Sequence, residues 1–168
     1  MFNLKPDYFI KGNISLLDPE LLVKDGIQGL ILDLDNTIMR PKSGFFCQIA
    51  ELWLSKAKAK NLKLIIVTNN KNEKYLNSLS QVLNQFELPI IIKARKPDPA
   101  KLLQALKQLD LPAGQVCIIG DRLLTDVLGG KNIGAKTAFV QPLLGQEENL
   151  LFRFLRKLEY LFLHPSFW

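Results

Sequence analysis

Cysteine and histidine are scarce in this chain, and long hydrophobic runs are missing. Only two cysteines, Cys47 and Cys117, occur among 168 residues, and their spacing matches no metal-binding motif. The single histidine, His164, lies far from every motif described below, so we expect no catalytic role for it. No apolar run approaches the ~20 residues of a membrane-spanning helix. The N-terminus lacks the features of a signal peptide, so we expect a cytoplasmic protein with reduced thiols.

The composition is that of a folded protein with an excess of positive charge. Hydrophobic residues make up 48% and charged residues 23% of the chain, and the formal net charge is +6. This length suits one domain with a sizeable core. The positive excess favours phosphate groups, nucleic acid or an acidic membrane surface as partners, and it does not choose among them.

Apolar runs alternate with helical patterns along the chain. We expect strands at 27–33, 62–68, 89–93, 115–120 and 136–140, and helices at 18–24, 45–60, 71–86, 98–109 and 123–131. This alternation predicts an α/β fold: a doubly wound, mainly parallel five-stranded sheet with helices on both faces. We interpret residues 1–168 as one domain, with a lead-in (1–26), a core (27–140) and a tail (147–168).

The first predicted core strand ends in two carboxylates. Leu30-Ile31-Leu32 is followed by Asp33, and Asp35 comes two residues later. Side chains alternate along a strand, so both acids would leave its end together. The negative charge of two neighbouring carboxylates at a buried strand end has to be compensated, and a divalent cation can do so. Taken alone, the segment fits ordinary turn and helix-cap chemistry equally well.

Polar residues follow the next three strands as well. Thr68 ends the second strand, Lys96-Pro97 follows the third, and Asp121 and Asp126 follow the fourth. Each alone has an ordinary interpretation, such as a helix cap for Thr68 or a solvated surface lysine for Lys96. Ligands of open α/β sheets bind at the carboxyl ends of the strands, so the joint order indicates a site there.

This ordered set resembles the haloacid dehalogenase superfamily of phosphotransferases. The four family motifs are matched by Asp33-Leu-Asp35-Asn-Thr37, by Thr68, by Lys96-Pro97 and by Gly120-Asp121-Arg-Leu-Leu-Thr-Asp126. The resemblance covers roughly residues 27–140 and implies the fold of that superfamily. An aspartate at position 35 implies a phosphatase rather than a dehalogenase.

The resemblance also implies roles in catalysis. Asp33 would attack phosphorus and form an aspartyl-phosphate, and Asp35 would act as general acid and then as general base. Thr68 and the Asn69 backbone N–H would hold the phosphoryl oxygens, although a turn role for the Asn69 side chain is at least as well supported. Lys96 would neutralise charge there and steady Asp33.

A magnesium ion is the implied cofactor. The resemblance assigns it to Asp33, the Asp35 backbone carbonyl and Asp121, with Asp126 holding a ligand water or orienting Lys96. Oxygen ligands that leave positions open for water and phosphate suit Mg²⁺. The two acids of the first motif should have different environments, because one must be ionised and the other briefly protonated.

The motif spacing leaves no room for a cap domain over this site. Asp33 and Thr68 are 35 residues apart, and Thr68 and Lys96 are 28 residues apart. We expect one helix and its loops to account for the first interval, and one helix and one short strand for the second. An open site suits a large or surface-anchored substrate. Residues 147–163 also form an amphipathic basic helical pattern, which could lie on an anionic membrane or pack on the core.

The substrate is narrowed by a subgroup resemblance. The segment 120–130 is similar to that of the YqeG-like phosphatases of subclass IIIA, a group that includes phosphatidylglycerophosphate phosphatases. It implies an anionic phospholipid headgroup as substrate and peripheral contact with the inner face of a membrane.

Alternative functions are a phosphatase of soluble sugar or nucleotide phosphates, a non-catalytic phosphate- or nucleic-acid-binding module, and a phosphorelay receiver domain. The chain lacks a nucleic-acid-binding motif, so we expect no nucleic-acid partner. The sequence does not indicate the oligomeric state.

Overall fold

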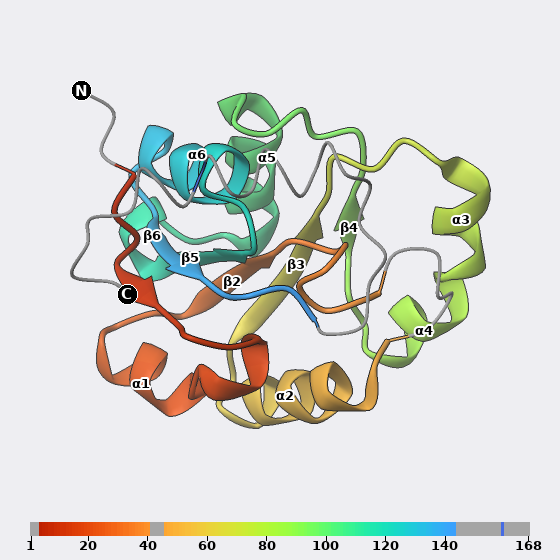
Figure 1. Cartoon of the computed structure of the whole chain (residues 1–168), viewed down its shortest axis with the longest axis horizontal. Helices are drawn as coiled ribbons and strands as arrows, with labels where there is room; N and C mark the ends of the chain where they lie inside the picture. Colours follow the sequence, from red (N-terminus) through yellow and green to blue (C-terminus); the bar gives the residue numbers. More distant parts are fainter. Residues whose placement is uncertain (1–3, 41–45, 144–158, 160–168) are drawn as a thin grey trace.

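A six-stranded sheet forms the centre of the molecule in the computed structural model (Figure 1). The structure describes residues 4–40, 46–143 and 159. The strand order is β1-β6-β5-β2-β3-β4, and every pairing between neighbouring strands is parallel. The strands are β1 (Tyr8–Phe9), β2 (Gly29–Leu32), β3 (Lys63–Val67), β4 (Ile90–Ile91), β5 (Val116–Gly120) and β6 (Lys136–Phe139). The predicted α/β parallel fold is therefore confirmed.

The central strands are buried on both faces. In β2, Leu30 and Leu32 pack in one apolar cluster, whereas Ile31 between them packs in the other. Strand residues alternate between the faces of a sheet, so a continuous apolar run is what two covered faces require. Cys117 of β5 is fully buried as a free thiol.

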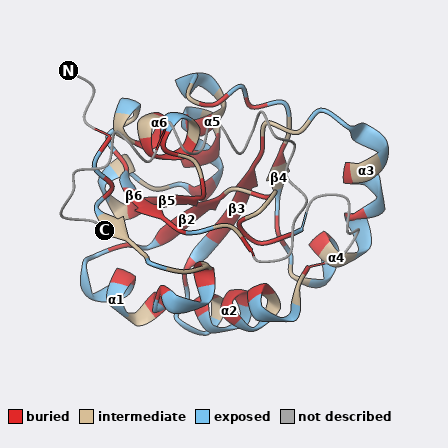
Figure 2. Ribbon diagram, viewed as in Figure 1, coloured by how far each residue is buried: buried red, intermediate tan, exposed pale blue. Residues whose placement is uncertain are grey.

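Helices cover both faces. One face carries α1 (Pro19–Lys24) and α2 (Gln48–Ala59), and the other carries α5 (Pro99–Leu109) and α6 (Leu128–Asn132). At one side of the sheet lie α3 (Glu73–Ser78) and α4 (Ser80–Gln85). Figure 2 shows the central strands buried between these layers, with exposed residues on the outer sides of the helices.

Local sequence explains where two of these helices begin. Asp18 and Asp98 accept hydrogen bonds from the N–H groups of Glu20 and Ala100, at 3.0 and 2.8 Å. Each is followed by a proline in the first turn, where the missing N–H costs no helix hydrogen bond. The starts of α1 and α5 thus follow from ordinary capping chemistry.

Three features differ from the sequence-based expectation. The sheet has a sixth strand, β1, which lies within the predicted lead-in and pairs with β6. The expected helix at 71–86 is two helices that meet at Leu79. No glycine or proline occurs between residues 73 and 85, so no local signal marks that break. The last expected helix begins as a π-helix at Leu123–Val127 before it continues as α6.

The predicted amphipathic tail, 147–168, lies outside the described residues except for Glu159. Among the helices that the structure describes, none is long and apolar enough to cross a membrane.

Asp7 fastens β1 to the edge of the sheet. Its carboxylate accepts hydrogen bonds from the N–H and hydroxyl of Thr137, both at 2.9 Å, and from Lys131 Nζ at 2.6 Å. The rings of Phe9 and Phe139 stack alongside, with centroids 5.5 Å apart. Burial alone would raise the pKa of Asp7, but the hydrogen bonds from Lys131 and Thr137 outweigh it and lower the pKa to about 2.

We expect Asp7→Asn to lower the free energy of unfolding at neutral pH, because the ion pair with Lys131 is lost. The loss should be only about 1 kcal/mol, because water screens partly exposed ion pairs. The folded pKa lies below the ordinary value of 3.8, so this stability is present above that value and is lost as the pH falls through about 2. Urea unfolding of both proteins across this range measures the difference. Asp110→Asn, at an exposed helix end, is the control, and a pH-independent loss in Asp7→Asn would contradict the assignment.

Candidate active site

The loop after β2 holds Asp33 at the end of the sheet. The Asp33 N–H donates to the Ile119 carbonyl at 2.9 Å, so the ladder to β5 extends through this residue. The chain then turns sharply, and the Asn36 N–H donates to the Met39 carbonyl at 2.8 Å. Asn36 has a φ of 69°, a conformation that asparagine adopts more readily than most residues. The turn carries the chain away from the strand directly after the acidic residues.

Lys96 joins two of the predicted acids. Its Nζ lies 2.7 Å from Asp33 Oδ1 and 2.7 Å from Asp126 Oδ1. The Lys96 and Asp126 side chains are each 1% exposed and that of Asp33 is 13% exposed, so water reaches the group only at Asp33. Burial would lower the pKa of Lys96, but the carboxylates of Asp126 and Asp33 outweigh it and raise the pKa. The ammonium group therefore stays charged.

Asn69 fixes the backbone that carries this lysine. Its side-chain oxygen accepts from the Lys96 N–H at 2.7 Å, and its Nδ2 donates to the Lys96 carbonyl at 3.1 Å. This reciprocal pair connects the end of β3 to the loop that follows β4. The Asn69 side chain thus has a structural role.

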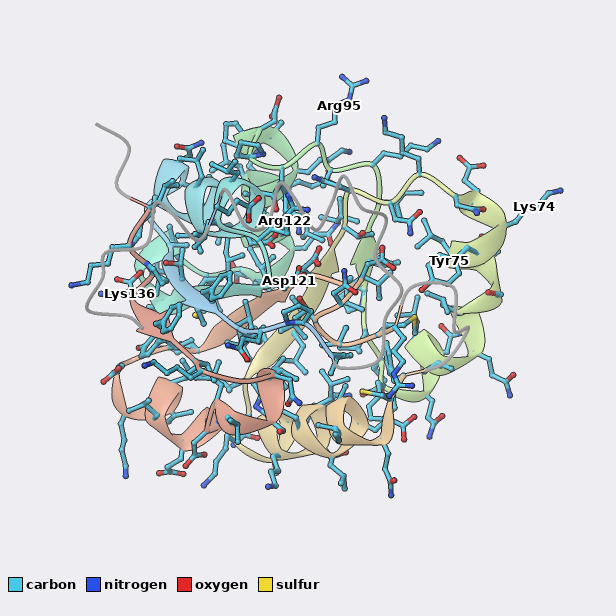
Figure 3. All side chains as sticks on the ribbon, in the orientation of Figure 1. Lys74, Tyr75, Arg95, Asp121, Arg122 and Lys136 are labelled. Carbon is cyan, nitrogen blue, oxygen red and sulfur yellow. The ribbon has the colours of Figure 1, made fainter. Side chains whose placement is uncertain are left out.

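The segment after β5 supplies the remaining acids. Asp121 follows Gly120 directly, and Asp126 lies on the π-helix turn, where its Oδ2 accepts from the Arg122 N–H at 3.2 Å. Carboxylate oxygens of Asp33, Asp121 and Asp126 all lie within 4.8 Å of one another. Figure 3 shows Asp121 and Arg122 near the centre of the view, whereas Lys74 and Arg95 project outward at the periphery.

This donor set fits a divalent cation. With all three carboxylates ionised, they and the Lys96 ammonium group would together carry two formal negative charges in a largely buried cluster. Uncompensated buried charge is costly, and hard oxygen donors at this spacing suit Mg²⁺ or a similar ion. The acidic cluster is thus consistent with a divalent metal site held by Asp33 and Asp121, with Asp126 beside them.

The electrostatic environment of Asp33 reflects this crowding. Burial raises the pKa of its carboxyl to about 8, Lys96 opposes the rise, and the charges of Asp126 and Asp121 add to it. A cation among the carboxylates would favour their ionised forms and lower this pKa.

Asp35 has different, uncharged partners. Its Oδ2 accepts from Asn70 Nδ2 at 2.9 Å, and the Tyr75 hydroxyl makes a long contact with its Oδ1 at 3.5 Å. The same hydroxyl lies 3.0 Å from Met39 Sδ. Burial raises the pKa of Asp35, and the hydrogen bonds from Asn70 and Tyr75 only partly offset it. Both acids of the first motif therefore have raised pKa values, but Asp33 is paired directly with Lys96, whereas the hydrogen-bond partners of Asp35 are neutral.

Thr68 is buried at the end of β3. Its Oγ1 accepts from the Asn70 N–H at 3.0 Å, which leaves the hydroxyl proton available for another acceptor. Its N–H donates to the Ile91 carbonyl of β4 at 3.0 Å. The hydroxyl is thus held by the same turn that carries the Asn70 side chain to Asp35.

The structure brings the predicted residues to one edge of the sheet. Asp33, Lys96, Asp121 and Asp126 lie close together. The turn that follows β3 connects Asp35, Thr68 and Asn69 to this cluster. Sequence reasoning missed the partners that orient these groups: Asn70, Tyr75, Arg122 and Glu159. Of these, Asn70 could have been suspected from its place beside Thr68.

The described segments between the motifs contain no cap domain. The chain forms α2 and β3 between Asp33 and Thr68, and α3, α4 and β4 between Thr68 and Lys96. These elements belong to the sheet and its flanking helices (Figure 1).

We expect Gly120→Ala to destabilise the protein by about 1–3 kcal/mol, because a Cβ there would overlap the Asp126 carboxylate. Gly114→Ala is the matched control, since a Cβ at that position would meet nothing within 4 Å. Urea unfolding of the two variants tests this expectation. Equal stabilities would show that Asp126 does not need the space at position 120.

Comparisons with known proteins agree with this geometry. A family model described as HAD-hydrolase-like matches residues 93–148. The p-nitrophenyl phosphatase of Archaeoglobus fulgidus has a similar fold, with a TM-score of 0.56 at 18% identity, covering 77% of this chain and 92% of that one.

Two relatives in sequence cover nearly all of this chain. The Bacillus subtilis protein named Probable phosphatase YqeG is 37% identical over 92% of this chain and 86% of its own length. Phosphatidylglycerophosphate phosphatase 1 of Arabidopsis thaliana is 26% identical over 93% of this chain, which spans 48% of that protein. The predicted family is therefore confirmed: the chain belongs to the haloacid dehalogenase superfamily of hydrolases, in the family that contains the Bacillus subtilis protein YqeG.

Proposed function

We propose that this protein is a Mg²⁺-dependent phosphomonoester hydrolase that acts through an aspartyl-phosphate on Asp33. The observation that carries the proposal is the Lys96 ammonium group, 2.7 Å from both Asp33 and Asp126, beside a third carboxylate from Asp121. Asp33 is the most exposed member of the buried ion-paired group, so a substrate can reach it.

In the first step, a carboxylate oxygen of Asp33 forms a bond to phosphorus while the bond from phosphorus to the ester oxygen breaks. Asp35 gives its proton to that leaving oxygen. Its raised pKa favours the protonated form that this step needs. Asn70 and Tyr75 hold the carboxyl group in place.

In the second step, Asp35 takes a proton from water, whose oxygen attacks phosphorus. The bond between phosphorus and Asp33 breaks, and inorganic phosphate leaves. The Thr68 hydroxyl and the Asn69 N–H stabilise the phosphoryl oxygens, and Lys96 holds Asp33 in position. Asp33, the Asp35 carbonyl and Asp121 would hold Mg²⁺, which would supply positive charge to the phosphoryl group when bound. Asp126 orients Lys96.

We further propose phosphatidylglycerophosphate as the substrate and phosphatidylglycerol as the product. The name of the Arabidopsis relative supports this assignment, as do the lack of a cap domain among the described residues and the net charge of +6. A lipid headgroup is presented at a membrane surface, so the site needs no lid to enclose it. The enzyme would then be cytoplasmic and act at the inner face of the membrane.

Asp33→Asn should lower kcat by at least about 10³-fold, because the amide cannot act as the nucleophile. Phosphate release with saturating Mg²⁺ measures the effect, and a circular dichroism spectrum verifies the fold. Asp110→Asn serves as the control and should retain wild-type activity. Substantial turnover by purified Asp33→Asn would overturn the nucleophile assignment.

The substrate assignment is tested with phosphatidylglycerophosphate in mixed micelles beside soluble sugar and nucleotide phosphates. We expect a higher kcat/KM for the lipid, and Asp33→Asn should abolish that activity. Turnover of soluble esters alone would retain the mechanism and reject the lipid. Binding of phosphate compounds without turnover of any of them would favour a non-catalytic module.

A further inference from the structure

Glu159 is a buried acid that contacts the loop between Asp121 and Asp126. Its side chain is 2% exposed. Its hydrogen-bond partners lie more than 35 residues earlier in the chain. Oε1 accepts from Arg122 Nε at 2.9 Å and Nη2 at 2.7 Å, and Oε2 accepts from the Leu123 N–H at 3.0 Å. Both carboxylate oxygens are therefore used.

The two partners lie in sequence between Asp121 and Asp126. The Arg122 N–H donates to Asp126 Oδ2 at 3.2 Å, and its carbonyl accepts from the Asp126 N–H at 3.0 Å. Asp126 Oδ1 in turn accepts from Lys96. A continuous series of hydrogen bonds thus leads from Glu159 to the acidic cluster.

The loop itself is an irregular element that has to be held in place. It forms a π-helix turn, a geometry that is rare and occurs frequently at functional sites. The apolar side chains of Leu123 and Val127 anchor it against Phe139. Apolar packing does not fix the rotation of the backbone, whereas hydrogen bonds to the Arg122 fork and the Leu123 N–H do.

A purely packing role for Glu159 is disfavoured by its cost. An ionised carboxylate loses its hydration on burial, and an apolar side chain of similar size would fill the space without that loss. The carboxylate here has charge-assisted partners in geometry typical of specific orientation. Groups that hydrogen-bond to metal ligands typically change metal affinity 10–100-fold when they are removed, and Glu159 is connected to Asp126 through Arg122.

We infer that Glu159 is a positioning residue for the cation site. It holds Arg122 and Leu123 so that Asp121 and Asp126 face Asp33 and Lys96. This inference rests on the proposed function, because it assumes that the acidic cluster binds a divalent cation. It adds a role for a residue outside the four motifs.

The test is calorimetric titration of the full chain with Mg²⁺ alone, without substrate. We expect Glu159→Gln to raise the Mg²⁺ dissociation constant about tenfold or more. Arg122→Lys keeps the positive charge and the Leu123 contact, so it should give a smaller increase. Glu87→Gln, an exposed acid paired with Lys58, is the control and should match the wild type.

Melting temperatures without Mg²⁺ separate positioning from general stability. A role in stability alone would lower the melting temperature of Glu159→Gln or Arg122→Lys and leave the dissociation constant unchanged, and that result would overturn the inference. If Glu159→Gln does not fold, the constant measured for Arg122→Lys decides. Failure of the wild type to bind Mg²⁺ would overturn the proposed metal site and this inference with it.

Discussion

The contact of the Lys96 ammonium group with Asp33 and Asp126 is the interaction on which the site depends. It joins residues from three separate parts of the chain: the end of β2, the loop after β4 and the turn after β5. Like charges this close and this buried would repel one another without it. Removing one partner of a buried ion pair typically costs about 3–5 kcal/mol because it leaves an unpaired buried charge, so loss of this lysine would destabilise the fold as well as disturb the nucleophile.

The sheet and the order of the candidate residues could be predicted because both depend on short, continuous stretches of sequence. Buried parallel strands appear as continuous apolar runs, and the polar residues come directly after them: Asp33 after β2, Thr68 after β3 and Asp121 after β5. The parallel topology then brings those ends to one edge. Strand β1 could not be predicted in this way, since two residues show no periodicity and its attachment depends on Asp7 and Phe9 contacting β6.

The residues that orient the site left weaker signals. Tyr75 reaches Asp35 across 40 residues and Glu159 reaches Arg122 across 37, and neither belongs to a local motif. Side-chain contacts between distant segments depend on how helices pack, which periodicity does not encode. Glu159 lies within the predicted amphipathic segment, and its side chain is buried against Arg122 and Leu123.

The most direct test of the account is the identification of the residue that becomes phosphorylated. The protein is incubated with a phosphomonoester substrate and Mg²⁺, quenched in acid, digested and analysed by tandem mass spectrometry. We predict a phosphoryl group on Asp33, which disappears as the substrate is exhausted. A phosphoryl group on another residue, or turnover with no phosphorylated protein under conditions that trap an acyl phosphate, would contradict the proposed mechanism.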